Sequence, residues 1–285
     1  MTAGGRPAVA VVGHVEVVEF AVVDHVPVPG EIVHASETFR LAAGGGAVAA
    51  VQLAKLAGAA AFFTALGGDA DGAQATRELT AAGLDLHSAT RDLPTRRGFS
   101  FLSADHERTI TVIGERLVPH GTDALPWGAL EEADAVYFTG GDVEALRRAR
   151  RARWLVATPR ALDTLRAARV QIDVLVSSAT DPGEQVADGL LDPAPTFVVR
   201  THGREGGEWV GHEGRTGRWA AHALPAAPVD SYGCGDAFAA GLTFALGDSD
   251  NLDTALQTAA ECGASVMCGR GPYAGQVIRA VGPGR

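Results

Sequence analysis

The sequence lacks the features of several common protein classes. It contains only three cysteines, Cys234, Cys262 and Cys268, and no Cys-x-x-Cys pair, so we expect reduced thiols rather than a disulfide framework. No apolar run approaches the ~18 residues that a membrane span requires, and the first residues lack the basic stretch of a signal peptide. These absences predict a cytoplasmic protein that does not bind membranes.

Positive charge is also scarce. Lysine occurs once, at Lys55, and 34 acidic residues outweigh 24 lysine and arginine residues, which gives a net charge of −10. Because nucleic-acid binding needs a basic surface, no nucleic-acid partner is expected. Leu56 follows the single lysine, which excludes a Walker phosphate-binding loop, since that loop needs Ser or Thr there. A dinucleotide-dependent oxidoreductase is disfavoured, because Gly13 begins no Gly-x-Gly-x-x-Gly turn.

The sequence does contain a repeated alternation of strand and helix patterns. Apolar periodicity, with glycines at the ends of segments, predicts strands at 7–13, 60–67, 133–140, 154–158, 170–178 and 196–201, followed by two short strands through Trp209 and Trp219. It predicts helices at 44–58, 71–82, 143–152, 161–168, near Glu184, at 236–246 and at 252–268. This alternation is typical of a mainly parallel central sheet flanked by helices on both faces. We predict a single α/β domain over residues 1–285.

Two other segments fall outside that rhythm. Residues 98–103 and 108–114 alternate between apolar and polar side chains and are joined by the polar stretch 104–107, which predicts a β-hairpin. Residues 14–41 contain short β-like pieces around a proline turn. We predict that parts of 14–41 and 96–116 form a small β-sheet lid over one end of the domain.

The stretch Asp230–Phe238, DSYGCGDAF, places two glycines and an acid at the start of a predicted helix. One explanation is a tight turn in which Asp236 caps the helix. The other is an anion hole formed by the N–H groups of Gly233, Cys234 and Gly235, with Asp236 as the general base of a phosphoryl transfer. The motif taken by itself leaves both explanations open.

The same stretch resembles the C-terminal signature of the ribokinase-like (phosphofructokinase-B type) carbohydrate kinases, Asp-Thr-x-Gly-Ala-Gly-Asp-x-Phe, with Ser231 and Cys234 replacing Thr and Ala. Other stretches resemble further segments of that family in the same order along nearly the whole chain. They are AGGGAVAAVQLAKLAG, the Gly-x-Asp-x-x-Gly stretch carried by Gly67, Asp69 and Gly72, the lid segment HERTITV, and the nucleotide segment carried by Thr201, Gly203 and Gly206.

The resemblance implies an ATP-dependent carbohydrate kinase in which Asp236 takes the proton of the acceptor hydroxyl. It implies the anion hole of Gly233, Cys234 and Gly235, and a nucleotide site of Ser178, Thr201, Gly203, Gly206 and Gly263. The substrate site it implies contains Glu16, Gly44, Gly45, Gly46, Val48 and Asp236. Mg²⁺ would enter with ATP near Asp181 or Glu184, although Asp181-Pro182-Gly183 also fits a simple turn. A monovalent cation such as K⁺ would lie at Asp230 and Ser231.

The chain also departs from the family pattern at two substrate positions. Val48 replaces the usual Asn, and Val18 stands where the family has a substrate-binding Asp, with Glu16 and Glu19 close by. Ribose would therefore lack polar partners, and fructose 6-phosphate would lack a basic clamp, so neither is expected to be the best substrate. The alternative function is a weakly active or inactive protein of this fold that binds a nucleotide or metabolite for regulation.

We also predict a homodimer formed through the lids. A small lid sheet exposes its edges and one apolar face, and a second copy would cover both. Members of the resembled family often pair in this way.

Overall fold

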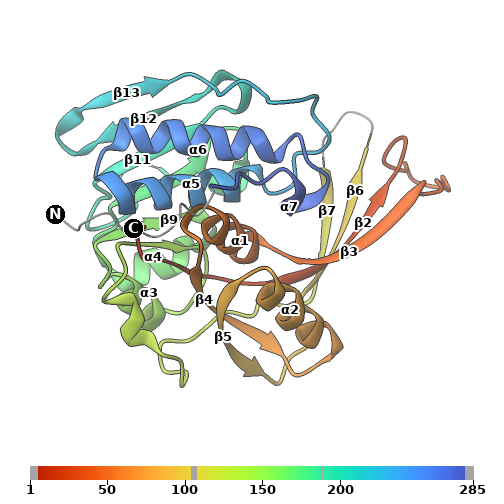
Figure 1. Ribbon diagram of the computed structural model, residues 1–285, viewed down its shortest axis with the longest axis horizontal. Coiled ribbons are helices and arrows are strands. Elements are labelled where there is room, and N and C mark those ends of the chain that lie inside the picture. Colours follow the sequence, from red (N-terminus) through yellow and green to blue (C-terminus); the bar gives the residue numbers. More distant parts are fainter. Residues whose placement is uncertain (1–5, 104–107, 188, 280–285) are drawn as a thin grey trace.

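The computed structural model describes residues 6–103, 108–187 and 189–279, and it has the predicted α/β architecture (Figure 1). The central sheet has nine strands in the order β13-β12-β11-β10-β9-β8-β1-β4-β5. Neighbours are parallel from β11 to β5, and the last two strands at the other edge are antiparallel. The strands are β1 (Val9–Val12), β4 (Ala60–Gly67), β5 (Leu84–Arg91), β8 (Ala135–Phe138), β9 (Trp154–Ala157), β10 (Val174–Ser178), β11 (Phe197–Thr201), β12 (Gly207–Gly211) and β13 (Thr216–Trp219).

Helices cover both faces of this sheet. One face packs against α1 (Gly45–Ala57), α2 (Ala70–Ala81), α5 (Cys234–Ser249) and α6 (Leu252–Val266), whose apolar side chains share one core with β1 and β4. The other face packs against α3 (Val143–Ala149) and α4 (Leu162–Ala168) in a second core. The short α7 (Gly271–Ala274) follows α6.

One local prediction was wrong and one strand was missed. The helix expected near Glu184 is only a 3-10 turn, Pro182–Glu184, begun by the Asp181 side chain, which accepts a hydrogen bond from Gly183 N. Strand β5 was not predicted, because its residues are mostly polar and half-buried at the sheet edge and give no clear alternation.

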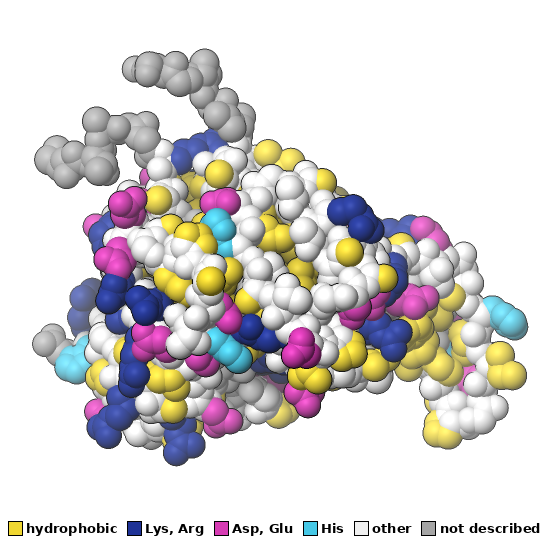
Figure 2. Space-filling model, turned by 90° about the horizontal axis from the view of Figure 1, so that it is seen from below, with side chains coloured by type: hydrophobic (Ala, Val, Ile, Leu, Met, Phe, Trp, Pro, Cys, Tyr) yellow, Lys and Arg dark blue, Asp and Glu magenta, His cyan; other side chains and the backbone are white. Residues whose placement is uncertain are grey.

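The lid is a separate four-stranded sheet in the order β3-β2-β6-β7. It contains β2 (Glu16–Val22), β3 (Glu37–Ala43), β6 (Arg97–Leu102) and β7 (Arg108–Ile113), and it projects from the body as Figures 1 and 2 show. The predicted β6–β7 hairpin is present as an antiparallel pair, while its connection at 104–107 lies outside the described residues. Strand β3 runs two residues beyond the predicted limit of 41.

The register divides the lid side chains between two faces. Val18 pairs with Gly98 and Phe20 with Ser100, which in turn pair with Val112 and Ile110, so these residues share the face that turns toward Tyr232. Glu19 and Phe99 are neighbours on the opposite face. Exposed apolar side chains on the lid include Val28, Ile32, Ile110, Val112 and Ile113. Figure 2 shows hydrophobic side chains on the projecting lid.

The carboxyl ends of the parallel strands lie at one edge of the main sheet, beside the lid. This edge is where open α/β sheets bind ligands. His14 follows β1, Thr139 follows β8, Arg160 follows β9 and Ser178 ends β10. Among the described residues, no helix is both long and apolar enough to cross a membrane.

Candidate active site

The glycine loop before α5 has the conformation that its sequence requires. Gly233 adopts φ 85°, and a Cβ there would lie 2.9 Å from Val48 Cγ1, so only glycine fits without strain. Gly233 is also the N-cap of α5, and no side chain caps this helix. Asp236 is the third helical residue, so the explanation of Asp236 as a helix cap is wrong.

The first turn of α5 presents free backbone donors beside Asp236. Cys234 N makes a long 3.4 Å contact with Ser231 O, whereas Gly235 N and Asp236 N have no partner in the part of the chain that the structure describes. Unpaired N–H groups at a helix N-terminus attract anions. Of the predicted anion hole, Gly235 therefore offers an unpaired donor and Cys234 is partly engaged, while Asp236 N is a further unpaired donor that was not among the predicted three.

The carboxylate of Asp236 lies against the start of α1. A Cβ added at Gly45 would lie 2.8 Å from Asp236 Oδ1 and 3.4 Å from Thr139 Oγ1, so the two helix starts and the end of β8 meet here. Burial raises the pKa of Asp236 to about 6, and the negative charge of Glu184 adds to this effect, while Arg108 and Arg160 oppose it. Asp236 is therefore a carboxylate that titrates near neutrality, as a general base should.

A second group of charged side chains lies at the base of the lid. Glu16 is 7% exposed, and its Oε1 lies 3.2 Å from Arg96 Nε and 3.5 Å from His14 Nε2. Burial lowers the pKa of His14, which favours the neutral imidazole, although its contact with Glu16 opposes this shift. Gly44 lies directly against Glu16, because a Cβ there would come within 3.1 Å of Glu16 N. The predicted substrate residues Glu16, Gly44, Gly45 and Asp236 thus line one continuous region.

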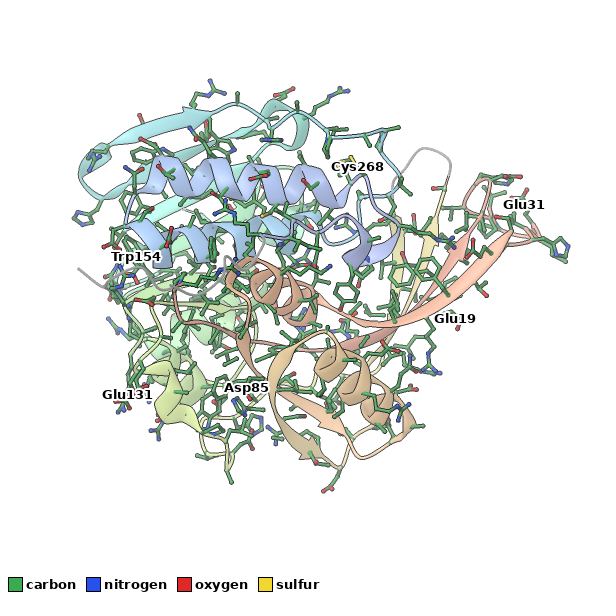
Figure 3. All side chains as sticks on the ribbon, viewed as in Figure 1. Glu19, Glu31, Asp85, Glu131, Trp154 and Cys268 are labelled. Carbon is green, nitrogen blue, oxygen red and sulfur yellow. The ribbon has the colours of Figure 1, made fainter. Side chains whose placement is uncertain are left out.

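The remaining residues predicted for the substrate site pack against other parts of the protein. Val48 and Val18 are fully buried in one apolar cluster with Phe20, Leu102 and Tyr232. Gly46 packs under His14, since a Cβ there would lie 2.6 Å from His14 O. Glu19, labelled on the lid in Figure 3, is exposed on the face opposite to Glu16. Only Glu16 of the two acids therefore faces the site.

The two carboxylates predicted to accompany Mg²⁺ both contact one arginine. Arg160 donates from Nε to Glu184 Oε1 at 2.9 Å and also pairs with Asp181. Glu184 Oε2 accepts a hydrogen bond from Ser178 N at 2.9 Å, which ties the predicted nucleotide residue Ser178 to this group. Within the described ranges, no group of three or more His, Cys, Asp or Glu side chains is placed to hold a metal ion.

The predicted monovalent-cation residues lie beneath the lid. Asp230 is 1% exposed and accepts hydrogen bonds from Tyr232 N at 2.8 Å and Gly271 N at 2.7 Å. Burial raises its pKa despite these bonds. Arg108, at the start of β7, donates to Ser231 O at 3.0 Å and to Ser231 Oγ at 3.2 Å. A fixed guanidinium therefore already occupies one side of this region.

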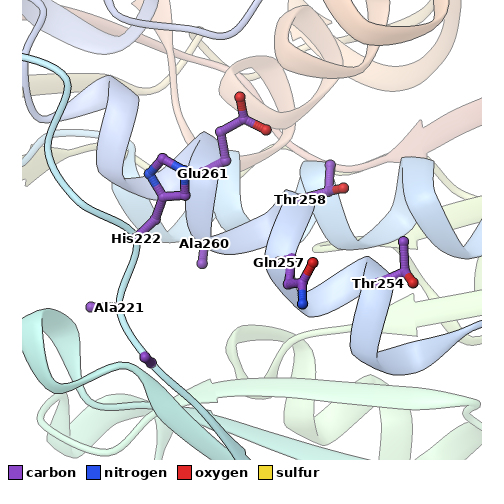
Figure 4. A pocket seen from close by; sticks show the side chains of 8 residues that line it. Ala221, His222, Thr254, Gln257, Thr258, Ala260 and Glu261 are labelled. Atoms are coloured by element: carbon purple, nitrogen blue, oxygen red, sulfur yellow. The ribbon is translucent and has the colours of Figure 1, made fainter.

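The predicted nucleotide segment forms a tight turn after β11. Gly206 has φ 84°, and a Cβ there would lie 2.7 Å from Ala221 N, so this turn lies against the chain that follows β13. That chain and α6 enclose a cavity of about 390 Å³ (Figure 4), lined by Ala220, Ala221, His222, Thr254, Gln257, Thr258, Ala260 and Glu261. Gly263 lies on α6 beside Cys234, with 3.3 Å between its ideal Cβ position and Cys234 O.

Sequence reasoning missed four arginines and one threonine that the fold brings to this region. They are Arg96, Arg108, Arg116, Arg160 and Thr139. Arg96 directly precedes β6, Arg108 begins β7, and Thr139, Arg160 and Arg116 follow strands. Their positions at strand ends next to the site are the only signal that points to them.

Comparisons with known proteins identify the family and the fold of the chain. The model of the pfkB family carbohydrate kinases matches residues 6–180 and 177–278. Among curated proteins, no sequence matches the chain. The fold is similar to a ribokinase from Thermotoga maritima (TM-score 0.76, 19% identity, 96% of this chain and 97% of that chain). It is also similar to an Arabidopsis thaliana ribokinase complexed with ribose and ATP (0.72, 20%, 94% and 96%) and to an adenosine kinase from Sinorhizobium meliloti (0.74, 18%, 94% and 96%).

Proposed function

Because the chain belongs to the pfkB family of carbohydrate kinases, we propose that it transfers the γ-phosphoryl group of ATP to a hydroxyl of a sugar or sugar-like small molecule. The observation that carries this proposal is the carboxylate of Asp236, with its pKa raised to about 6, beside the free N–H groups of the α5 N-terminus. A base and an anion site are the two groups that this reaction needs from the protein.

In the proposed reaction, the acceptor oxygen forms a bond to the γ-phosphorus while the bond from that phosphorus to the β–γ bridging oxygen breaks. ADP leaves with the electron pair, and the hydroxyl proton passes to Asp236. The N–H groups of Gly235 and Asp236, with Cys234 and Gly233 nearby, stabilise the charge on the transferring group. Gly45 lets the acceptor approach, since any side chain there would meet Asp236 Oδ1.

The nucleotide would extend from this loop toward the Thr201–Gly206 turn and the cavity beside α6. Gly263, next to Cys234, and Ser178, tied to Glu184, flank that path. Mg²⁺ enters as part of the MgATP substrate and neutralises phosphate charge. Asp181 and Glu184 are the nearest candidates to face it, and Arg160 between them supplies a fixed positive charge toward the same phosphates.

Three further features belong to the proposal. A monovalent cation would be held by Asp230 and the Ser231 carbonyl, but the guanidinium of Arg108 competes for that carbonyl, so we expect weak dependence on K⁺. The lids would pair through the face that carries Phe99 and Phe101, whose rings contact at 5.0 Å. The protein would act in the cytoplasm.

The test is ADP formation from MgATP with a broad panel of sugars, polyols and nucleosides. We expect saturable turnover with at least one acceptor, and loss of that turnover in Asp236→Asn. ATP binding without turnover of any acceptor would instead support the regulatory alternative, to which the buried Val18 and Val48 point.

A further inference from the structure

Three arginines lie where the base of the lid meets the main sheet. Arg96 directly precedes β6, Arg116 follows β7, and Arg160 follows β9. The Arg116 guanidinium donates from Nη1 to Arg160 O at 3.1 Å, which places these two residues in contact. Gly114, two residues before Arg116, lies beside Arg96, since a Cβ on Gly114 would lie 3.9 Å from Arg96 Cα. The charges of Arg96 and Arg160 both act on Arg116.

The nearby carboxylates do not form one ion pair with each of these arginines. Arg160 is paired with both Asp181 and Glu184. Arg96 lies at ion-pair distance from Glu16, but its buried Nε makes no hydrogen bond there. Arg116 has no carboxylate within ion-pair distance among the described residues.

The surroundings of Arg116 disfavour its charged form when no further anion is bound. Burial lowers the pKa of Arg116, and the neighbouring charge of Arg96 lowers it further, while Glu16 only partly compensates. A partly buried guanidinium beside a second one is stabilised when an anion binds between them. The planar fork of each arginine suits bidentate binding of a phosphate or a carboxylate.

This arginine pair is also placed on the acceptor side of the site. Glu16, which contacts Arg96, is in turn packed against Gly44, next to Gly45 and the Asp236 carboxylate. The charge of Asp236 acts on Arg116 as well. Arg160 instead pairs with Asp181 and Glu184, the two carboxylates proposed to face MgATP.

We infer that the acceptor carries an anionic group, a phosphate monoester or a carboxylate, which Arg116 and Arg96 bind while its hydroxyl lies at Asp236. This inference deepens the proposed function and rests on it. Arg116 and Arg96 determine specificity, and Glu16 orients the Arg96 guanidinium. The predicted hairpin over 96–116 brings Arg96 and Arg116 to the same end of the lid, but its periodicity does not show that this end lies beside Asp236. Under this inference, a phosphorylated sugar would meet two guanidinium groups on the acceptor side.

A binding experiment tests the anion site without knowledge of the true acceptor. The nucleotide site is first filled with Mg²⁺ and a non-hydrolysable ATP analogue, so that the α5 N-terminus is occupied. Inorganic phosphate and acetate are then titrated by calorimetry against the parent, Arg116→Ala and Arg96→Ala. The control is Arg97→Ala, which removes an exposed arginine from the opposite face of the lid.

We expect one of the two anions to bind the parent and Arg97→Ala equally. Its dissociation constant should rise on the order of 10- to 100-fold in Arg116→Ala and in Arg96→Ala, as for loss of a charge-assisted hydrogen bond. Preference for phosphate would indicate a phosphate monoester, and preference for acetate a carboxylate. Melting temperatures within a few degrees of the parent show that each variant is folded. Equal binding to all four proteins, or no binding to the parent, would overturn the inference.

Turnover measurements with different acceptors distinguish a failure of this inference from a failure of the proposed function. Neutral sugars are compared with their 6-phosphates and with the corresponding aldonic acids in the ADP assay. Higher kcat/KM for an anionic member, lost in Arg116→Ala through KM, supports the inference. Neutral sugars turned over at least as well as anionic ones would overturn the anion site and leave the kinase assignment intact. Failure of the ATP analogue to bind would count against the kinase assignment itself.

Discussion

The proposed site has two halves that are built in different ways. The phosphoryl-transfer half is a contiguous stretch, Gly233–Asp236, fixed by one helix start, and most of its groups are backbone N–H donors. The acceptor half is assembled from separated segments that contribute long charged side chains, namely Glu16, Arg96 and Arg116. Backbone donors serve any triphosphate, whereas side chains can be exchanged individually. Under the proposed function, the first half carries out the chemistry and the second half sets the specificity.

The two halves also differ in how their charges are compensated. Asp236 is an acid whose pKa burial raises to about 6, so its charged form is costly. Arg116 is a base whose pKa burial lowers, so its charged form is costly as well. Protonation of Asp236 therefore stabilises the first half, and binding of an anion at Arg116 stabilises the second.

The largest expected effect is in the transfer half. Asp236→Asn keeps the shape of the side chain but removes the proton acceptor, so kcat should fall by ~10²–10⁴-fold. ATP binding should persist, because backbone groups hold the phosphates. Turnover within a few-fold of the parent would remove Asp236 from the mechanism.

Asp236→Asn should also change how the stability of the protein depends on pH. Since the folded-state pKa of Asp236 lies above the ordinary value of 3.8, its ionisation destabilises the folded protein progressively as pH rises between those values. Asp236→Asn abolishes that cost, so above pH 6 its free energy of unfolding should equal or exceed that of the parent. Urea denaturation at pH 4 and pH 8 measures this, and a greater gain at pH 4 than at pH 8 would contradict it.

The next largest effect concerns the junction of the two halves. Gly45→Ala would place a methyl group 2.8 Å from Asp236 Oδ1 and displace the carboxylate, and a misplacement of this kind costs about 10²-fold in kcat. The matched control is Gly128→Ala, where an added Cβ meets nothing within 4 Å. Equal activity of the two variants would mean that Asp236 and Gly45 do not act together.

A smaller effect is expected in the pH dependence of kcat/KM. Activity should rise with pH through about 6 as Asp236 loses its proton. Glu184→Gln removes a negative charge that raises this pKa, so the acid limb should move to lower pH. Arg108→Gln removes a positive charge that lowers it, so the limb should move to higher pH. Shifts in the same direction for both variants would exclude Asp236 as the titrating group.

The sequence predicts the first half of the site better than the second, for a physical reason. Gly233, Gly235 and Asp236 are adjacent, and their residue types are those that a helix-start anion site requires. The parallel sheet and the lid hairpin also follow from periodicity. Arg96 and Arg116 flank the predicted hairpin, but only the pairing of β6 with the distant β2 brings that end of the hairpin to Glu16, and no local pattern encodes this pairing. Strand β5 was missed for a similar reason, since its pairing with β4 decides its structure.

The smallest expected effect concerns the residue that positions the acceptor half. Asp69 caps α2 by accepting a hydrogen bond from Gly72 N at 2.8 Å, and it also accepts from Thr95 N at 2.8 Å, immediately before Arg96. Burial alone would raise the pKa of Asp69, but these hydrogen bonds hold it below its usual value. Asp69→Ala should therefore lower the free energy of unfolding by about 1 kcal/mol, as for other lost helix caps.

The same substitution should also loosen Arg96, so the KM of the acceptor should rise while kcat changes little. Asn251→Ala is the matched control, because Asn251 caps α6 through Thr254 N at 2.9 Å and has no contact with the lid. It should lose similar stability and leave the acceptor KM unchanged. If both variants raise that KM equally, the effect reflects general destabilisation, and Asp69 does not position the arginine that distinguishes the acceptor half from the transfer half.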